Sequence, residues 1–175
     1  TWADSHKLSD LSALCSQFAV QSQSGITRQL AGPTGERNSY AILPREHVLC
    51  LAEVEGDLLT QLAAVLAVGG SAVWPETDLT KALFPRLPRE IQAKIKRVAD
   101  WTKDEVVFDA VLHHGDSDQL RAVCQQVAQR GGAIVGVHGL SQGETAIGLE
   151  RLVIERALSV NTAAAGGNAS LMTIG

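Results

Sequence analysis

The sequence predicts an α/β fold built on an open, mostly parallel sheet with helices on both faces. A short apolar run, a stretch of helical period, a Gly-Gly pair and a second apolar run follow one another twice, over residues 47–75 and 110–137. Parallel strands need such crossovers, which are right-handed in nearly all sheets. The 175 residues suit one domain with a sizeable core, and a charged fraction of 19% argues against disorder.

An amphipathic helix is expected within residues 2–23. Its apolar side chains recur at the spacing of one helix face, at Leu8, Leu11, Leu14, Cys15 and Phe18. Gly25 ends this helix, and the Gly- and Pro-rich residues 32–38 predict a loop with turn chemistry.

The first strand–helix–strand unit begins with a buried strand at residues 47–52. Asp57 is placed to cap the following helix, and Gly69 is placed to end it in the left-handed conformation. A second strand covers residues 71–74. One face of the helix carries Leu58, Leu62, Val65 and Leu66.

Residues 85–97 connect the two units. Pro88 suits the first position of a helix, on which Ile91 and Ile95 would share a face. The basic residues of this segment are more typical of a solvated helix face than of a phosphate contact.

The second unit repeats the pattern of the first. A strand covers residues 110–113, Asp116 or Asp118 caps the next helix, residues 131–132 end it, and a strand follows at 133–137. The apolar face of this helix carries Leu120, Val123, Cys124 and Val127.

We expect no cofactor site in this sheet. The dinucleotide fingerprint GxGxxG and the phosphate loop GxxxxGK[ST] are both absent. The Gly-Gly pairs stand at helix C-termini, whereas phosphates bind at N-termini. Carboxylates at both helix N-termini, from Asp57 and from Asp116 or Asp118, would repel a pyrophosphate.

We also expect no catalytic residue and no metal ligand. The three cysteines, Cys15, Cys50 and Cys124, lie in apolar settings where thiols act as small hydrophobic side chains. We expect them to be reduced thiols of a cytosolic protein. His113 and His114 are neighbours on a strand and therefore point to opposite faces. They are expected to be structural or solvent-exposed rather than to share a metal.

The last residues differ from the rest of the chain. Residues 159–175 contain no Lys, Arg, Asp or Glu, and their side chains are mostly small. Two positions remain open for them: a groove on another domain or subunit, or an edge strand of their own domain. A net charge of −4 argues against binding to nucleic acid or an anionic membrane, and no apolar run reaches the ~18 residues of a spanning helix.

Two segments resemble proline utilization A, a family of long bifunctional flavoenzymes of proline catabolism. Residues 150–175, ERLVIERALSVNTAAAGGNASLMTIG, closely resemble the C-terminus of those proteins, and residues 32–40, GPTGERNSY, look like another part of them. The chain starts at Thr1 and its only methionine is Met172, so we expect it to be the C-terminal domain cut from a longer protein.

The resemblance implies a parent that oxidises proline with FAD and glutamate semialdehyde with NAD, in separate domains joined by an internal tunnel. Residues 1–158 would form a noncatalytic, Rossmann-like domain of the aldehyde dehydrogenase superfamily, with 149–162 as a β-flap. Residues 159–175 would dock on the dehydrogenase domain of the same or a neighbouring chain, as part of a lid over the tunnel. The docking residues are Ser159, Val160, Asn161, Thr162, Gly166, Gly167, Asn168, Ser170, Leu171, Met172, Ile174 and Gly175.

The resemblance also implies a homo-oligomeric, cytoplasmic parent, with peripheral attachment to the inner membrane as a further expectation. An NAD-binding or aldehyde dehydrogenase-type catalytic fragment is the alternative function, because it would share the fold. DNA binding is a third class, but the resemblance places the DNA-binding segment of enteric-type members at the opposite end of the parent.

Overall fold

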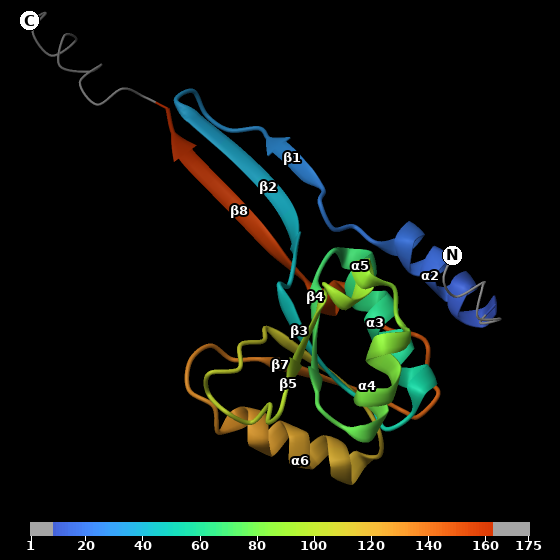
Figure 1. Cartoon of the computed structure of the whole chain (residues 1–175). Helices are drawn as coiled ribbons and strands as arrows, with labels where there is room; N and C mark the ends of the chain where they lie inside the picture. The colour runs from blue at the N-terminus through green and yellow to red at the C-terminus, as the bar shows by residue number, and fades with distance from the viewer. Residues whose placement is uncertain (1–8, 163–175) are drawn as a thin grey trace, which may run out of the picture.

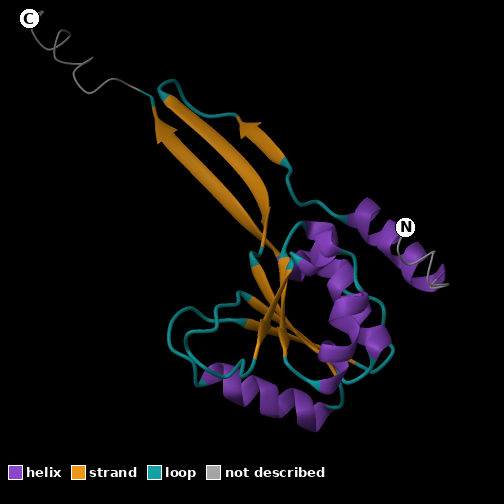
Figure 2. Cartoon of the chain, in the orientation of Figure 1, coloured by secondary structure: helices purple, strands orange, loops and turns teal. Residues whose placement is uncertain are grey.

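A computed structural model describes residues 9–162 as two sheets of different character (Figure 1). A five-stranded sheet with helices on both faces forms the body of the molecule, and a three-stranded sheet projects from it (Figure 2). No helix among the described residues has the length and apolar character needed to cross a bilayer.

The five-stranded sheet confirms the predicted α/β class. All its neighbouring strands are parallel, in the order β5-β4-β3-β6-β7. With the strands counted along the chain this is the 3-2-1-4-5 order of a Rossmann-like sheet. The strands are β3 (His47–Leu51), β4 (Ser71–Pro75), β5 (Ile95–Val98), β6 (Ala110–His114) and β7 (Gly136–Leu140).

Side-chain alternation along these strands gives the body two cores. One core lies between the sheet and α3 (Glu55–Val68), and receives Val48, Cys50, Ala72, Trp74, Ala110 and Leu112 from the strands. The other lies under α6 (Ser117–Ala128), and receives Leu49, Val73 and Val111. Because strand residues alternate between faces, a fully apolar strand supplies both cores at once.

The helix α3 is buried on nearly all sides. Its outer side is covered by α2 (Ser9–Gln21), which inserts Phe18 into the same core. This confirms the helix predicted within residues 2–23 for the part that the structure describes. Gly69 ends α3 with a φ of 89°, which is the left-handed conformation predicted for it.

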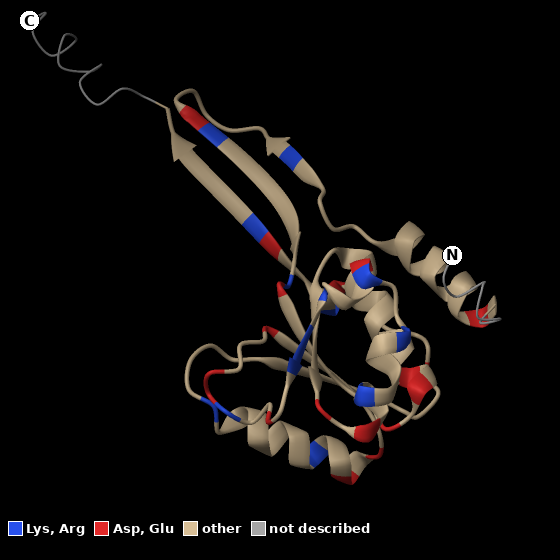
Figure 3. Ribbon diagram, viewed as in Figure 1, with Lys and Arg blue, Asp and Glu red and all other residues tan. Residues whose placement is uncertain are grey.

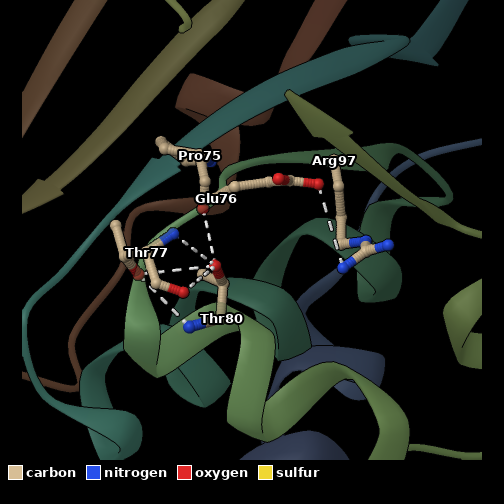
Figure 4. Close-up of polar contacts among 5 residues, drawn as sticks. All are labelled: Pro75, Glu76, Thr77, Thr80 and Arg97. Atoms are coloured by element: carbon tan, nitrogen blue, oxygen red, sulfur yellow. Dashed lines mark hydrogen bonds and ion pairs between the residues drawn. The ribbon is translucent and has the colours of Figure 1, made fainter. Parts of the chain in front are cut away.

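A reciprocal cap starts α4 (Asp78–Leu83) directly after β4 (Figure 4). The Thr80 backbone N–H donates to Thr77 Oγ1 over 3.2 Å, and the Thr77 N–H donates to Thr80 Oγ1 over 2.9 Å. The Thr80 hydroxyl also donates to the Pro75 carbonyl over 2.7 Å. These bonds satisfy the free N–H groups of a short helix and make a sharp turn at the end of the strand.

The segment between α4 and β5 differs from its prediction. It forms a 3-10 turn, η1 (Phe84–Arg86), and a single helical turn, α5 (Arg89–Gln92), with Pro88 one position before the helix. Ile95 was expected on this helix but begins β5, so the predicted Ile91–Ile95 face is wrong. The basic side chains of the segment are exposed, as predicted for a solvated surface: Arg86, Arg89, Lys94, Lys96 and Arg97.

Three helix and strand ends also differ from the predictions. Val54, not Asp57, is the N-cap of α3, and Asp57 is its third residue. The helix α6 ends at Ala128 with Gln129 as its C-cap, before the Gly-Gly pair, and Gly132 takes a φ of 99° in the loop beyond. The strand expected at 133–137 is β7, shifted by three residues, because the loop continues to Val135.

The projecting sheet, which we call the flap, contains β1 (Thr27–Leu30), β2 (Glu36–Pro44) and β8 (Val153–Asn161). They pair antiparallel in the order β1-β2-β8. A 3-10 turn, η2 (Leu149–Leu152), leads into β8 and is anchored in the body by Leu149 and Leu152. The loop predicted at 32–38 is correct only up to Gly35, because β2 already starts at Glu36.

Candidate functional site

Two places in this fold are candidates for function: the crevice where strand order reverses, and the flap. The crevice lies beyond the carboxyl ends of β3 and β6, the position at which open α/β sheets bind nucleotides. It is a hollow of about 400 Å³ lined by Glu53, Val54, Asp57, His114, Gly115, Asp116, Gln119, Ser141 and Gln142.

The N-terminus of α6 is occupied by a side chain of the protein itself. Asp116 Oδ1 accepts hydrogen bonds from the Asp118 and Gln119 N–H groups, over 2.9 and 2.8 Å. Gln119 completes the cap by accepting from the Asp116 N–H. Asp116 is therefore the cap that the sequence left open between two aspartates, and the N–H groups that would hold a phosphate are already satisfied.

The N-terminus of α3 is closed by a loop. Asp57 is 5% exposed, and its Oδ1 accepts from the Gly143 N–H over 2.9 Å. The loop that carries Gly143 is held further by Ser141, whose N–H donates to the Glu144 carboxylate over 2.9 Å. A buried carboxylate and a loop thus stand where the diphosphate of a dinucleotide would approach, so these residues do not fit NAD.

His114 is a structural residue of the crevice wall. Its Nε2 lies 2.8 Å from the Glu144 carbonyl, and its Nδ1 lies 2.8 Å from Gln61 Nε2. The carbonyl can only accept and the amide nitrogen can only donate, so His114 is a neutral ring protonated at Nε2. Gln61 is oriented by a second bond, from Nε2 to the Leu51 carbonyl over 2.9 Å. Both ring nitrogens of His114 are committed.

His113 faces a different environment. Its side chain is 6% exposed, and its Nδ1 has no hydrogen-bond partner. Burial lowers the pKa of His113. A Cβ at Gly115 would lie 2.6 Å from the His113 ring, so glycine is required for this packing. Both histidines are buried, which rules out the solvent-exposed alternative.

The three cysteines lie on three different elements of the fold and differ in burial. Cys50 is buried in the core, and burial raises the pKa of its thiol. Cys15 is half-buried, whereas Cys124 is exposed, so its predicted apolar setting is wrong. Within those residues no three metal-ligating side chains come together.

The flap presents two faces that differ in burial. Directly paired residues of an antiparallel sheet share a face, so Leu158 lies with its partner Ser39, and Ile154 with its partner Leu43. We call this the Leu158 face; Ala41, Arg156 and Val160 also belong to it. Ile154 is 42% and Leu158 45% exposed. Arg156 lies between these two exposed apolar side chains on the same face.

The other face of the flap turns toward the body at its base. There Ile42 is only 8% exposed, close to Gln21 of α2 and Val68 of α3. Farther out, Tyr40 hydrogen-bonds Glu155, and partial burial together with this carboxylate raises the pKa of Tyr40. This face is thus partly used by the body, and the Leu158 face is not.

Four of the predicted docking residues lie at the end of β8. Ser159, Asn161 and Thr162 are exposed and Val160 is half-buried. The outer part of β8, residues 157–161, carries no charged side chain (Figure 3). The strand is the edge of its sheet, so its outer N–H and C=O groups have no partner strand in the described part of the chain. The other eight predicted docking residues, from Gly166 to Gly175, lie outside the described residues.

No family model matches the chain. Among curated proteins, the bifunctional protein PutA of Escherichia coli is 57% identical over 166 residues, which is 95% of this chain and 13% of that protein. A solved PutA variant from Bradyrhizobium japonicum superposes with a TM-score of 0.55 at 20% identity, covering 75% of this chain and 15% of that one. An NAD-dependent benzaldehyde dehydrogenase from Corynebacterium glutamicum superposes with a TM-score of 0.51 at 15% identity, covering 76% of this chain and 34% of that one.

The two superpositions establish a shared fold. They establish nothing beyond the fold, because sequence identities of 20% and 15% are too low to transfer a function. The chain spans about an eighth of the length of the curated relatives it matches. The high identity over nearly the whole chain confirms the resemblance drawn from residues 32–40 and 150–175, and the chain belongs to the PutA family as a segment of that much larger protein.

Proposed function

We propose that this chain is a noncatalytic lid and scaffold of a bifunctional proline-catabolic enzyme, placed at its C-terminus. In this role it covers the tunnel that carries the intermediate between the two active sites, and it supports the dehydrogenase domain. The observation that carries the proposal is the exposure of two large apolar side chains, Ile154 and Leu158, on the Leu158 face of the flap.

The flap is poorly explained as an isolated element. A small sheet needs one apolar face packed against something, yet Ile154 and Leu158 remain nearly half exposed. Covering them would contribute roughly 1 kcal/mol for each side chain. An uncharged strand end with an open edge is also suited to receive another domain. The dehydrogenase domain of the same or a neighbouring chain is the proposed partner.

The crevice supports the noncatalytic part of the proposal. Asp116 and Asp57 fill the two helix N-termini with negative charge, and His114 has no free nitrogen. FAD and NAD then serve the other domains of the parent and need no site in this segment. We further propose a cytoplasmic, homo-oligomeric parent, in which a neighbouring chain can supply the surface that the flap meets.

Leu158→Asp in the full-length protein tests the docking. A carboxylate buried in an interface is unfavourable by several kcal/mol, so the flap should detach. Proline oxidation should continue while conversion of proline to glutamate acquires a transient lag, measured by stopped-flow detection of NADH.

Ala157→Asp is the matched control. It places the same carboxylate one residue away on the opposite face of β8. This variant should show no lag. A Leu158→Asp enzyme with unchanged coupled turnover and no lag would refute the proposed lid function.

A further inference from the structure

The base of the flap is held by polar bonds as well as by the packing of Ile42 and Leu152. Here β2 runs into β3 through Arg45 and Glu46, and η2 runs into β8 beside them. A hollow of about 430 Å³ lies at this junction, lined by Leu43, Pro44, Arg45, Glu46, Asp109 and Ile154. Because this hollow leaves the junction incompletely packed, hydrogen bonds across it contribute to the direction of the flap.

Arg45 connects three segments at this point. Its backbone N–H donates to the Leu152 carbonyl over 2.9 Å, and its Nε donates to the Arg151 carbonyl over 3.1 Å. Its Nη1 donates to the Asp109 carbonyl over 3.0 Å. One half-buried guanidinium therefore bridges the turn before β8 and the residue before β6.

Asp109 completes the connection from the side of the body. Its Oδ2 accepts from the Glu46 N–H over 2.9 Å and from the His47 N–H over 3.1 Å. Its own N–H donates to the His47 carbonyl over 2.7 Å. The turn that carries Arg45 is thereby fixed to the start of β6.

We propose that Arg45 and Asp109 form a clamp that sets the direction in which the flap leaves the body. The two sheets share no hydrogen-bonded ladder, so rotation about residues 44–47 and 151–153 is opposed by these bonds together with the packing of Ile42 and Leu152. Arg45 and Asp109 are positioning residues: they hold the Leu158 face where its partner can meet it. This inference rests on the proposed lid function.

The clamp predicts different results for similar substitutions. Arg45→Ala loses both side-chain arms, and Arg45→Lys keeps the charge but cannot reach two carbonyls in a fixed fork. Asp109→Ala loses the acceptor, whereas Asp109→Asn keeps an oxygen that can accept from the same two N–H groups. Arg45→Ala, Arg45→Lys and Asp109→Ala should therefore loosen the flap, and Asp109→Asn should retain most of the wild-type behaviour.

Hydrogen exchange of the full-length protein measures the loosening. Peptides covering 44–47 and 151–155 should exchange about tenfold faster in the loosened variants, as expected when charge-assisted hydrogen bonds are lost. Peptides covering β4 and α3 should be unchanged. Arg86→Ala is the control, since it removes an exposed arginine that pairs with Glu55 away from the junction.

Coupled turnover separates the clamp from the lid. Loosened variants that show a lag while proline oxidation is unchanged would support the clamp as a positioning device. Wild-type exchange in Arg45→Ala, or full rescue by Arg45→Lys, would overturn the clamp. Faster exchange without a lag would overturn the positioning role if Leu158→Asp does cause a lag. If Leu158→Asp causes none either, the lid function fails and the mechanical clamp stands.

Discussion

The body and the flap use similar apolar residues for opposite purposes. In the body, every residue of β6 is buried and the strand supplies two cores. In the flap, seven of the nine residues of β8 are exposed, and the strand is the edge of its sheet. Burial in the body comes from other elements of the same chain, whereas Ile154 and Leu158 of the flap stay exposed among the described residues. The tightly packed part of the chain and the surface proposed for docking are thus different sheets.

The largest expected effect concerns the body. Leu112→Ala should lower the free energy of unfolding of this chain by about 3 kcal/mol, because it removes a fully buried side chain and leaves a cavity next to α3. Chemical denaturation measures this change. A loss below about 1 kcal/mol would mean that the body is much less tightly packed than its two cores indicate.

An intermediate effect is expected where α6 begins. Asp116→Ala should lower the free energy of unfolding by about 1 kcal/mol, because two backbone N–H groups lose their acceptor. Asp118→Ala is the control: its exposed ion pair with Arg121 should contribute about 0.5 kcal/mol or less. Thermal unfolding measures both changes. An equal loss of unfolding free energy in the two variants would contradict the assignment of Asp116 as the cap.

The smallest effect is expected on the flap. Leu158→Ala should change the free energy of unfolding of this chain by about 0.5 kcal/mol or less, because its side chain touches little in the chain itself. A loss as large as that of Leu112→Ala would show that the Leu158 face is covered within the chain. That result would remove the contrast between body and flap.

Most of the body could be predicted from the sequence because its signals are local. Strands at 47–52, 71–74 and 110–113 are apolar runs, and Gly69 marks a helix end by its freedom to adopt positive φ. The strand β5 was missed because Ile91 and Ile95 have helical spacing. Asp57 was misassigned because the group that satisfies it, the Gly143 N–H, lies 86 residues later in the chain.

Most of the flap could not be predicted in this way. The strand β8 falls within residues 149–162, which the family resemblance implied to be a β-flap, whereas its partner strand β2 was not expected. The polar residues at the start of β2 predict a loop, and only their pairing with β8 shows that they form a strand. The exposed position of Cys124 and the burial of both His113 and His114 likewise depend on which elements pack over them.

The sequence by itself determined the α/β class, the two strand–helix–strand units of the body and the absence of a phosphate-binding motif, because these follow from periodicity and from residue type. Only the tertiary structure decided which aspartate caps α6 and that a distant loop contacts Asp57 at the N-terminus of α3. It also decided that Arg45 and Asp109 form hydrogen bonds at the base of the flap. Each of these depends on groups that are far apart along the chain and meet only when the two sheets have formed.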